Sequence, residues 1–442
     1  MPWSELDTAA VSRALSQIAE QPEDLVDAYF ERREEVELPP EEAAAPGPRL
    51  RRETGFAVRL LRGRRGWLAS RDDLGERAFA EAMRQVARVL PAVGYPEPAV
   101  RAVPPGRCDV AEMLDFPGLV ARAVRAHHVG FPVRLGLRRH RRWLQVVGPR
   151  LVAEPQREAF YSCTLDLPWG RHGALLPRLD AAAAAEVADA AVALFRARHA
   201  TPPAAGRETV VVLGPAAVAV LLHEAVAHAL EADTLARGGR PEAALGVQLG
   251  ATCLDVLDDP RAAPAEVRRD SDDEGIPVCR RWLLRGGVVE QPLADAAWSR
   301  AAPALLPGAG RRGSRHLPPG PRSSHLELLP GTATESDLLS GAGAGGLYLP
   351  AATRGTLDPL TGRFTLLVPH VRRIRRGALA EPAGACALRG QVADLLGRAT
   401  AAGAAAVPAG AGWCAKGGQK LPVWATVPPL RMEGVAVEAA AP

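Results

Sequence analysis

The chain has 442 residues, of which 47% are hydrophobic, and its 54 basic and 50 acidic residues leave a net charge of +4. This length is enough for two or three domains, and the nearly balanced charge argues against a nucleic-acid-binding protein. No run reaches the roughly 18 apolar residues of a membrane span, and the acidic N-terminus lacks the apolar segment of a signal peptide. We therefore expect a soluble cytoplasmic protein that does not bind membranes.

The first 203 residues predict a mixture of helices and strands. An amphipathic helix opens the chain with Ser4 as its N-cap, and a helix at 179–199 begins at Asp180. Apolar spacing and turn residues predict, between these helices, a strand or short helix at 25–35, a linker at 38–48, a hairpin of 56–61 with 66–69, a helix at 74–90, a hairpin of 133–137 with 142–147, and a strand at 158–167. The basic run at 138–142 is typical of a solvated face. Because Thr201-Pro202-Pro203 ends the last helix, we place a domain boundary there.

The rest of the chain predicts a β-rich part with a few helices. A β-branched strand at 209–213 leads through Gly214-Pro215 into a helix at 216–230 that is rich in Ala and Leu. The elements expected after it are strands at 246–257, 277–291, 347–349, 363–368, 371–376 and 422–430, a flexible glycine-rich stretch at 341–346, and a helical stretch at 386–400. The chain as a whole therefore predicts the α+β fold class.

The helix at 216–230 carries the residues with the clearest chemistry. His223 and His228 flank Glu224, and two imidazoles with a carboxylate can hold a divalent metal and activate a water. Zinc proteases commonly space these histidines four residues apart, whereas a spacing of five leaves them roughly 140° apart on an ideal helix. One metal could join both only if the helix contains a π-bulge or ends at His228. A buried helix with two hydrogen-bonded histidines and an ion-paired glutamate explains the spacing equally well.

The six cysteines include no CxxC pair, and most should be reduced and buried in a cytoplasmic chain. Cys414 differs, since it lies among glycines just before Lys416, and a nearby cation favours the thiolate. A thiolate is also a good zinc ligand.

These motifs resemble those of the TldD/PmbA family, whose members were first described as modulators of DNA gyrase and are understood as metallopeptidases. His223 to Asp233 (HEAVAHALEAD) is similar to the family signature HEAxGHxLExD, in which the spacing of five is the rule. The other similar stretches, in family order, are Asp272 to Pro277 (DDEGIP), Gly310 to His325 (GRRGSRHLPPGPRSSH), Leu357 to Phe364 (LDPLTGRF) and Gly412 to Gln419 (GWCAKGGQ). The resemblance covers the chain from about Thr209 onward and is weak before it.

The resemblance implies a smaller N-terminal α+β domain, residues 1–203, and a β-rich C-terminal metallopeptidase domain, residues 204–442. It also implies one Zn²⁺ per chain with His223, His228 and Cys414 as its ligands and Glu224 as general base, although iron or cobalt could bind the same set. Glu231 and His316 are further candidates. Glu231 follows His228 by three residues and would orient it or form a structural ion pair, and His316 would line the substrate cleft.

Three functions follow from these observations. The first is a zinc metallopeptidase that hydrolyses small or unfolded peptides, or matures a peptide-like natural product, paired with a TldE/PmbA-like partner or with itself. The second is a non-catalytic partner or scaffold subunit, against which the intact ligand set argues. The third is a nucleic-acid-associated regulator, against which the charge argues. Ala227 stands where the family has glycine and His325 where it has asparagine, so the substrate range is open.

Overall fold

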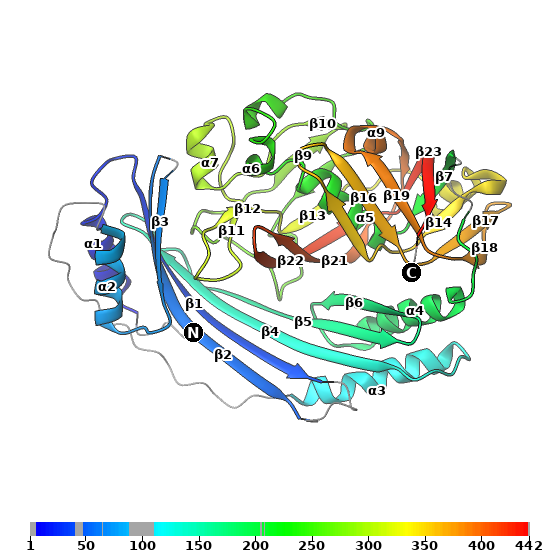
Figure 1. Ribbon diagram of the computed structural model, residues 1–442, viewed down its shortest axis with the longest axis horizontal. Helices are drawn as coiled ribbons and strands as arrows, with labels where there is room; N and C mark the ends of the chain where they lie inside the picture. The colour runs from blue at the N-terminus through cyan, green and yellow to red at the C-terminus, as the bar shows by residue number, and fades with distance from the viewer. Residues whose placement is uncertain are drawn as a thin grey trace.

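The computed structural model describes residues 6–39, 47–63, 65–87, 110–203, 206 and 208–440. Its first part is a six-stranded antiparallel sheet in the order β3-β2-β1-β4-β5-β6, with four helices around it (Figure 1). The elements are α1 (Thr8–Ser16), β1 (Leu25–Leu38), β2 (Arg49–Arg62), β3 (Arg65–Arg71), α2 (Glu76–Ala87), α3 (Ala111–Ala126), β4 (Arg134–Val147), β5 (Gln156–Leu167), β6 (Gly170–Leu176) and α4 (Ala181–Ala197). The long strands curve beneath the C-terminal elements (Figure 1).

Most of the elements predicted in this part are present. The hairpin of 56–61 with 66–69 is β2 with β3, and the Asp180 side chain accepts a hydrogen bond from the Ala183 N–H at the start of α4. Ser4, Cys108 and the last residues of the helix predicted at 74–90 lie outside the described residues; the N-cap of α1 is Asp7, which accepts from the Ala10 N–H. The domain boundary at residue 203 remains a prediction.

The hairpin predicted from 133–137 and 142–147 is wrong, because these residues form one continuous strand, β4. The basic run that was expected to be solvated lies opposite acidic residues of β1, and Arg138 pairs with Glu37 at 3.1 Å. Arg142 is buried and binds Glu31 at 3.0 Å. These cross-strand ion pairs satisfy the charges without a turn.

The C-terminal part contains a nine-stranded mixed sheet, a second six-stranded sheet and a two-stranded ribbon. Its strands are β7 (Glu208–Leu213), β8 (Val256–Asp258), β9 (Arg281–Arg285), β10 (Val288–Val289), β11 (Gly310–Arg311), β12 (Gly320–Pro321), β13 (His325–Leu328), β14 (Leu347–Leu349), β15 (Arg354–Leu357), β16 (Arg363–Val368), β17 (Val371–Arg375), β18 (Ala378–Ala383), β19 (Cys386–Gln391), β20 (Ala399–Ala402), β21 (Val407–Lys416), β22 (Gln419–Val427) and β23 (Leu430–Ala439). Its helices are α5 (Pro215–Leu222), the π-helix η1 (His223–Ala227), α6 (Ala232–Leu235), η2 (Pro241–Ala244), α7 (Ala296–Ala301), α8 (Glu335–Ser340), η3 (Gly343–Gly345) and α9 (Val392–Gly397). The α+β class is confirmed.

Two predictions in this part are only partly right. The stretch at 386–400 was expected to be helical, but β19 precedes the short α9, because β19 pairs with β16 on one side and β23 on the other. Of the strand predicted at 246–257, only Val256 and Leu257 belong to a strand, β8, while Gln248 makes an isolated bridge with Val288. In the stretch that begins at Cys386 the sheet partners, which are distant in sequence, decide the conformation and override local propensity.

Helix α5 lies at the centre of the C-terminal core (Figure 1). It contacts β21 and β22 of the six-stranded sheet and also β7, β15 and β16 of the nine-stranded sheet. Each of its residues is buried or half-buried, as expected of a helix that is apolar on all sides. Packing from both sheets therefore fixes the C-terminal end of α5, where the histidine motif begins.

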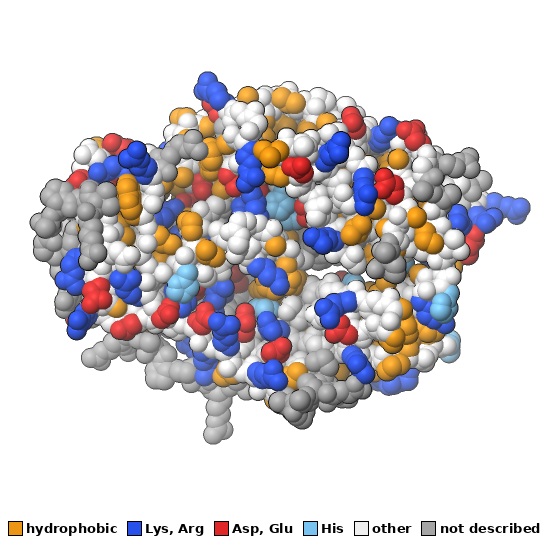
Figure 2. All heavy atoms as spheres, in the orientation of Figure 1, with side chains coloured by type: hydrophobic (Ala, Val, Ile, Leu, Met, Phe, Trp, Pro, Cys, Tyr) orange, Lys and Arg blue, Asp and Glu red, His pale blue; other side chains and the backbone are white. Residues whose placement is uncertain are grey.

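Buried ion pairs join the N-terminal sheet to the C-terminal part. Asp273 contacts Arg142 of β4 and Arg269, and Glu274 binds Arg59 of β2 at 2.7 Å. These acidic residues belong to the stretch 272–277, so this motif contributes contacts between the two parts. On the face shown in Figure 2, basic and acidic side chains of the described residues are interspersed. Among the described residues, no helix is long and apolar enough to span a membrane.

Candidate metal centre

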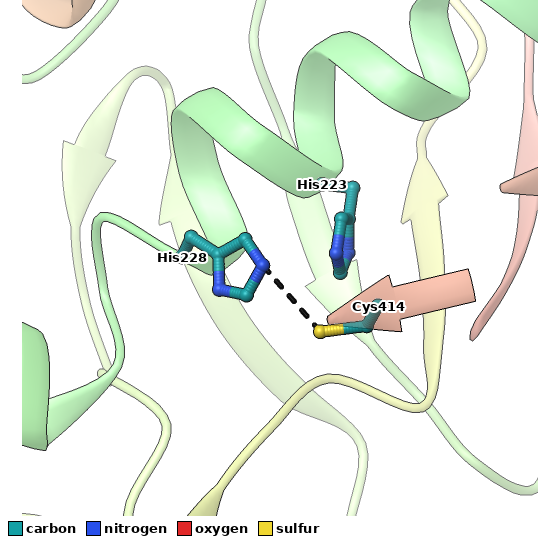
Figure 3. Close-up of side chains that lie close together, drawn as sticks. All are labelled: His223, His228 and Cys414. Carbon is teal, nitrogen blue, oxygen red and sulfur yellow. Dashed lines mark hydrogen bonds between the residues drawn. The ribbon is translucent and has the colours of Figure 1, made fainter. Parts of the chain in front are cut away.

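The histidine motif begins where α5 changes from an α-helix to a π-helix. His223–Ala227 form η1, and the His228 N–H donates to the His223 carbonyl at 3.0 Å, which is the i to i+5 bond of a π-turn. The wider turn brings the two imidazoles, five residues apart, onto one side, with ring centroids 4.5 Å apart (Figure 3). The backbone thus has the irregularity that the spacing requires.

Cys414 approaches the two histidines from the six-stranded sheet of the C-terminal part. It lies on β21, an edge strand, and its Sγ is 3.4 Å from Nε2 of His228 (Figure 3). One ligand atom from each of His223, His228 and Cys414 lies within 4.8 Å of the others. Two nitrogens and a sulfur are a donor set typical of zinc.

Each imidazole is oriented through its Nδ1 atom. His228 Nδ1 lies 2.9 Å from Oε2 of Glu231, which is fully buried, and His223 Nδ1 lies 3.4 Å from the Ser323 hydroxyl. His228 therefore directs its Nε2 toward Cys414, and His223 Nε2 is buried without a hydrogen-bond partner among the described residues. A buried polar atom without a partner is costly, so a metal ion at this position would fit the residues present.

Lys416 ties the cysteine strand to the histidine segment. Its ammonium group contacts Glu231, lies 2.7 Å from Oδ1 of Asp233, and lies 3.0 Å from the Thr234 hydroxyl. Since Lys416 follows Cys414 by two residues, these contacts hold the end of β21 against the residues that follow His228.

The two histidines have opposite pKa shifts. Burial lowers the pKa of His223 to about 3. Burial also lowers the pKa of His228, but the Glu231 carboxylate and the Cys414 sulfur outweigh it and raise that pKa to about 11. Burial raises the pKa of Glu231, while His228 and Lys416 together lower it to about 2. Ligand binding to a metal requires the neutral imidazole, so His228 would release its proton to the solvent on binding.

Glu224 follows His223 directly and faces a cleft. Its carboxyl is half-buried, and burial raises its pKa. Gly355 of β15 packs directly against it, because a Cβ atom added to Gly355 would stand 2.2 Å from Cγ of Glu224. Only glycine leaves room for the glutamate in this position.

The cleft has a volume of about 980 Å³ and lies between the two parts of the chain. One wall comes from β1, β4, β5 and β6 of the N-terminal sheet, and the other from α5, β15, β21 and β22, with His223 and Glu224 among the lining residues. A cleft of this size is typical of a ligand site.

His316 lies apart from the group formed by His223, His228 and Cys414. It is about half exposed, its Nδ1 lies 2.9 Å from the Ser70 hydroxyl, and its Nε2 lies 3.4 Å from Asp72. Its predicted role at the substrate cleft remains untested. Sequence reasoning missed the contacts of Ser323 and Gly355, because both come from segments about 100 or more residues away from the histidines.

The sequence profile of the PmbA/TldA metallopeptidase C-terminal domain matches residues 206–439. A Haemophilus influenzae protein named metalloprotease TldD homolog is 30% identical over 236 residues, 51% of this chain and 47% of that protein. A metalloprotease of Methanothermobacter thermautotrophicus is 29% identical over 243 residues, 55% of this chain and 52% of that protein. The match thus spans about half the length of these curated relatives.

Solved structures share the fold over nearly the whole chain. TldE from Thermococcus kodakarensis is 18% identical with a TM-score of 0.71, covering 97% of this chain and 100% of that one. A Thermotoga maritima structure, described as a candidate modulator of a DNA gyrase, is 16% identical with a TM-score of 0.72. The match covers 97% of this chain and 99% of that one. Since the family profile matches just over half of the residues, the chain belongs to the TldD/PmbA metallopeptidase family.

Proposed function

We propose that this protein is a zinc-dependent metallopeptidase that hydrolyses amide bonds in small or unfolded peptides or in a peptide-like natural product. The observation that supports it best is the convergence of ligand atoms from His223, His228 and Cys414 within 4.8 Å of one another, beside a cleft of about 980 Å³. The relatives named metalloproteases support the same reaction class.

One Zn²⁺ per chain would be held by the Nε2 atoms of His223 and His228 and by Sγ of Cys414. Three protein ligands leave a coordination position open, which is the pattern of catalytic zinc sites. When bound, the zinc supplies a Lewis acid that polarises a carbonyl group and lowers the pKa of water.

Glu224 is the residue that we assign to proton transfer. It follows His223 directly, lines the cleft, and is held at one side by Gly355. Its carboxylate would take a proton from the attacking water and then give it to the nitrogen of the leaving amine, so that one group acts as base and then as acid.

Glu231 and Ser323 would act by orienting the imidazoles. Such outer contacts fix the ring tautomer and raise the basicity of a ligand. We also propose that the protein pairs with a TldE/PmbA-like protein or with a second copy. The family resemblance and the presence of a TldE among the structural relatives support this pairing.

Metal content of wild type and Cys414→Ala, with peptide hydrolysis followed in parallel, tests the proposal. The matched control is Cys163→Ala, since Cys163 lines the same cleft and burial raises its pKa to about 12. We expect about one zinc per chain in the wild type and the control, as a single catalytic site requires, and loss of zinc and activity in Cys414→Ala. Full zinc in Cys414→Ala would remove Cys414 from the ligand set. Wild-type protein without zinc or hydrolysis after zinc loading would refute the peptidase function.

A further inference from the structure

Most cations that line the cleft are neutralised by the protein itself. The ion pairs are Arg33 with Glu31 at 2.7 Å, Arg138 with Glu37 at 3.1 Å, Arg141 with Glu34 at 3.4 Å, Arg142 with Glu31 at 3.0 Å, and Arg171 with Asp166 at 2.5 Å. One neutral donor is paired as well, since the Ser162 hydroxyl lies 2.8 Å from His140 Nε2. Two lining cations, Arg354 and Lys420, have no acidic partner among the described residues.

These two cations differ in what surrounds them. The Lys420 ammonium lies over the Trp413 ring, 4.6 Å from its centroid, so an aromatic face partly stabilises its charge. Arg354 is exposed, and no hydrogen bond, ion pair or ring contact holds its guanidinium among the described residues. Arg354 is therefore the cleft cation that is most available to a ligand.

Arg354 also lies close to the proposed catalytic carboxylate. It is the first residue of β15, and the next residue, Gly355, is the one that packs against Glu224. Arg354 and Glu224 both line the same cleft. A substrate anchored by Arg354 would therefore have its nearest amide bonds beside Glu224.

We propose that Arg354 binds a carboxylate of the substrate and thereby selects peptides with a negative charge near the bond that is cut. This inference rests on the proposed peptidase function. A planar guanidinium can donate two parallel hydrogen bonds to a carboxylate, and such charge-assisted pairs are strong. The carboxylate can be the free C-terminus of a short peptide or the side chain of an Asp or Glu residue.

Three acetylated tetrapeptides separate these sources: tetra-alanine with a free C-terminal carboxylate, the same peptide as a C-terminal amide, and an amide with glutamate at the third position. Their affinities are measured by calorimetry on the zinc-loaded Glu224→Gln protein, which lacks the proposed proton carrier. The same measurement is made after adding Arg354→Gln, Lys420→Gln or, as the matched control, Arg171→Gln. Arg171 lines the same cleft but is paired with Asp166.

We expect a carboxylate-bearing peptide to bind roughly 10- to 100-fold more tightly than the plain amide, as hydrogen bonds to charged groups allow. Arg354→Gln should abolish this preference and Arg171→Gln should keep it. Preference for the free acid identifies the C-terminus, and preference for the glutamyl amide identifies a side chain. Equal affinities for all three peptides, a preference that survives Arg354→Gln, or its loss only in Lys420→Gln would overturn the assignment. Hydrolysis by the unmodified enzyme is measured separately, so that a preference in binding without any cleavage would refute the peptidase function alone.

Discussion

The close contact between Gly355 and Glu224 gives the sharpest test of the proposed proton carrier. In Gly355→Ala the new Cβ would lie 2.2 Å from Cγ and 3.1 Å from Cδ of Glu224. Carbon atoms pack at about 3.5–4.0 Å, so the glutamate side chain must move by roughly 1.5 Å. The three atoms nearest this methyl group belong to Glu224 and Val220 and not to His223, His228 or Cys414, so the proposed metal site should keep its zinc.

A displacement of about 1 Å at a reacting group can cost roughly 100-fold in rate. We therefore expect kcat for peptide hydrolysis to fall about 100-fold in Gly355→Ala, with zinc content unchanged. The strain should also lower the free energy of unfolding by about 1–3 kcal/mol, as for other overpacked sites. The matched control is Gly390→Ala on β19, where an added Cβ meets nothing within 4 Å.

Zinc content, urea denaturation and steady-state kinetics would be measured on both variants. A Gly355→Ala protein that is folded, loaded with zinc and as active as the wild type would refute the role of Glu224 in proton transfer. An equal loss in Gly390→Ala would trace the effect to the sheet instead of to the glutamate.

Three further predictions concern the surroundings of the site and the interior. Lys416→Met should weaken zinc binding about 10- to 100-fold in a chelator competition, because Lys416 holds the Glu231 carboxylate that orients His228. An unchanged zinc affinity would mean that other contacts hold the Glu231 carboxylate in place. Asp273→Asn should lower the free energy of unfolding by about 3–5 kcal/mol, since it leaves buried arginines short of a partner, whereas the exposed Asp72→Asn should cost less than about 1 kcal/mol; similar losses would contradict this account. Burial lowers the pKa of His325 to about 4, so the unfolded chain binds a proton that the folded chain does not, and about 3 kcal/mol of stability should be lost as the pH falls from about 6.5 to about 4. Urea denaturation at pH 7 and pH 4 should show a smaller loss in His325→Gln, and an equal loss would assign the pH dependence to other groups.

The sequence was most informative where the chemistry is local. The spacing of His223 and His228 required a π-bulge or a helix end for a shared metal, and the structure has a π-turn that ends at His228. Glu231, three residues further on, could be assigned to orienting a histidine or to an ion pair, and it makes both contacts, with His228 and with Lys416. Residues within one turn of a helix have few possible arrangements, so spacing alone limits them strongly.

The sequence was least informative where distant segments decide the outcome. The basic run at 138–142 looked solvated because its acidic partners on β1 lie about 100 residues earlier. The contacts of His316 are with Ser70 and Asp72, far earlier in the chain, and its place at the substrate cleft stays a prediction. Nothing in the sequence around Ser323 or Gly355 indicates that Ser323 lies beside His223 or that Gly355 lies beside Glu224. These contacts depend on sheet pairing, which composition and periodicity do not specify.

The π-turn explains why the common four-residue spacing would not serve in this fold. Residue 227 is the position that would carry the second histidine at that spacing, and Ala227 is fully buried in the core with Ala225 and Val226. A π-turn is a rare and strained form of helix, which persists where the surrounding packing fixes it. Here α5 and η1 are held between two sheets, and β21 of one of those sheets also carries Cys414. The same packing therefore sets both the turn that aligns the histidines and the strand that carries Cys414, so the spacing of His223 and His228 in sequence is a consequence of the core.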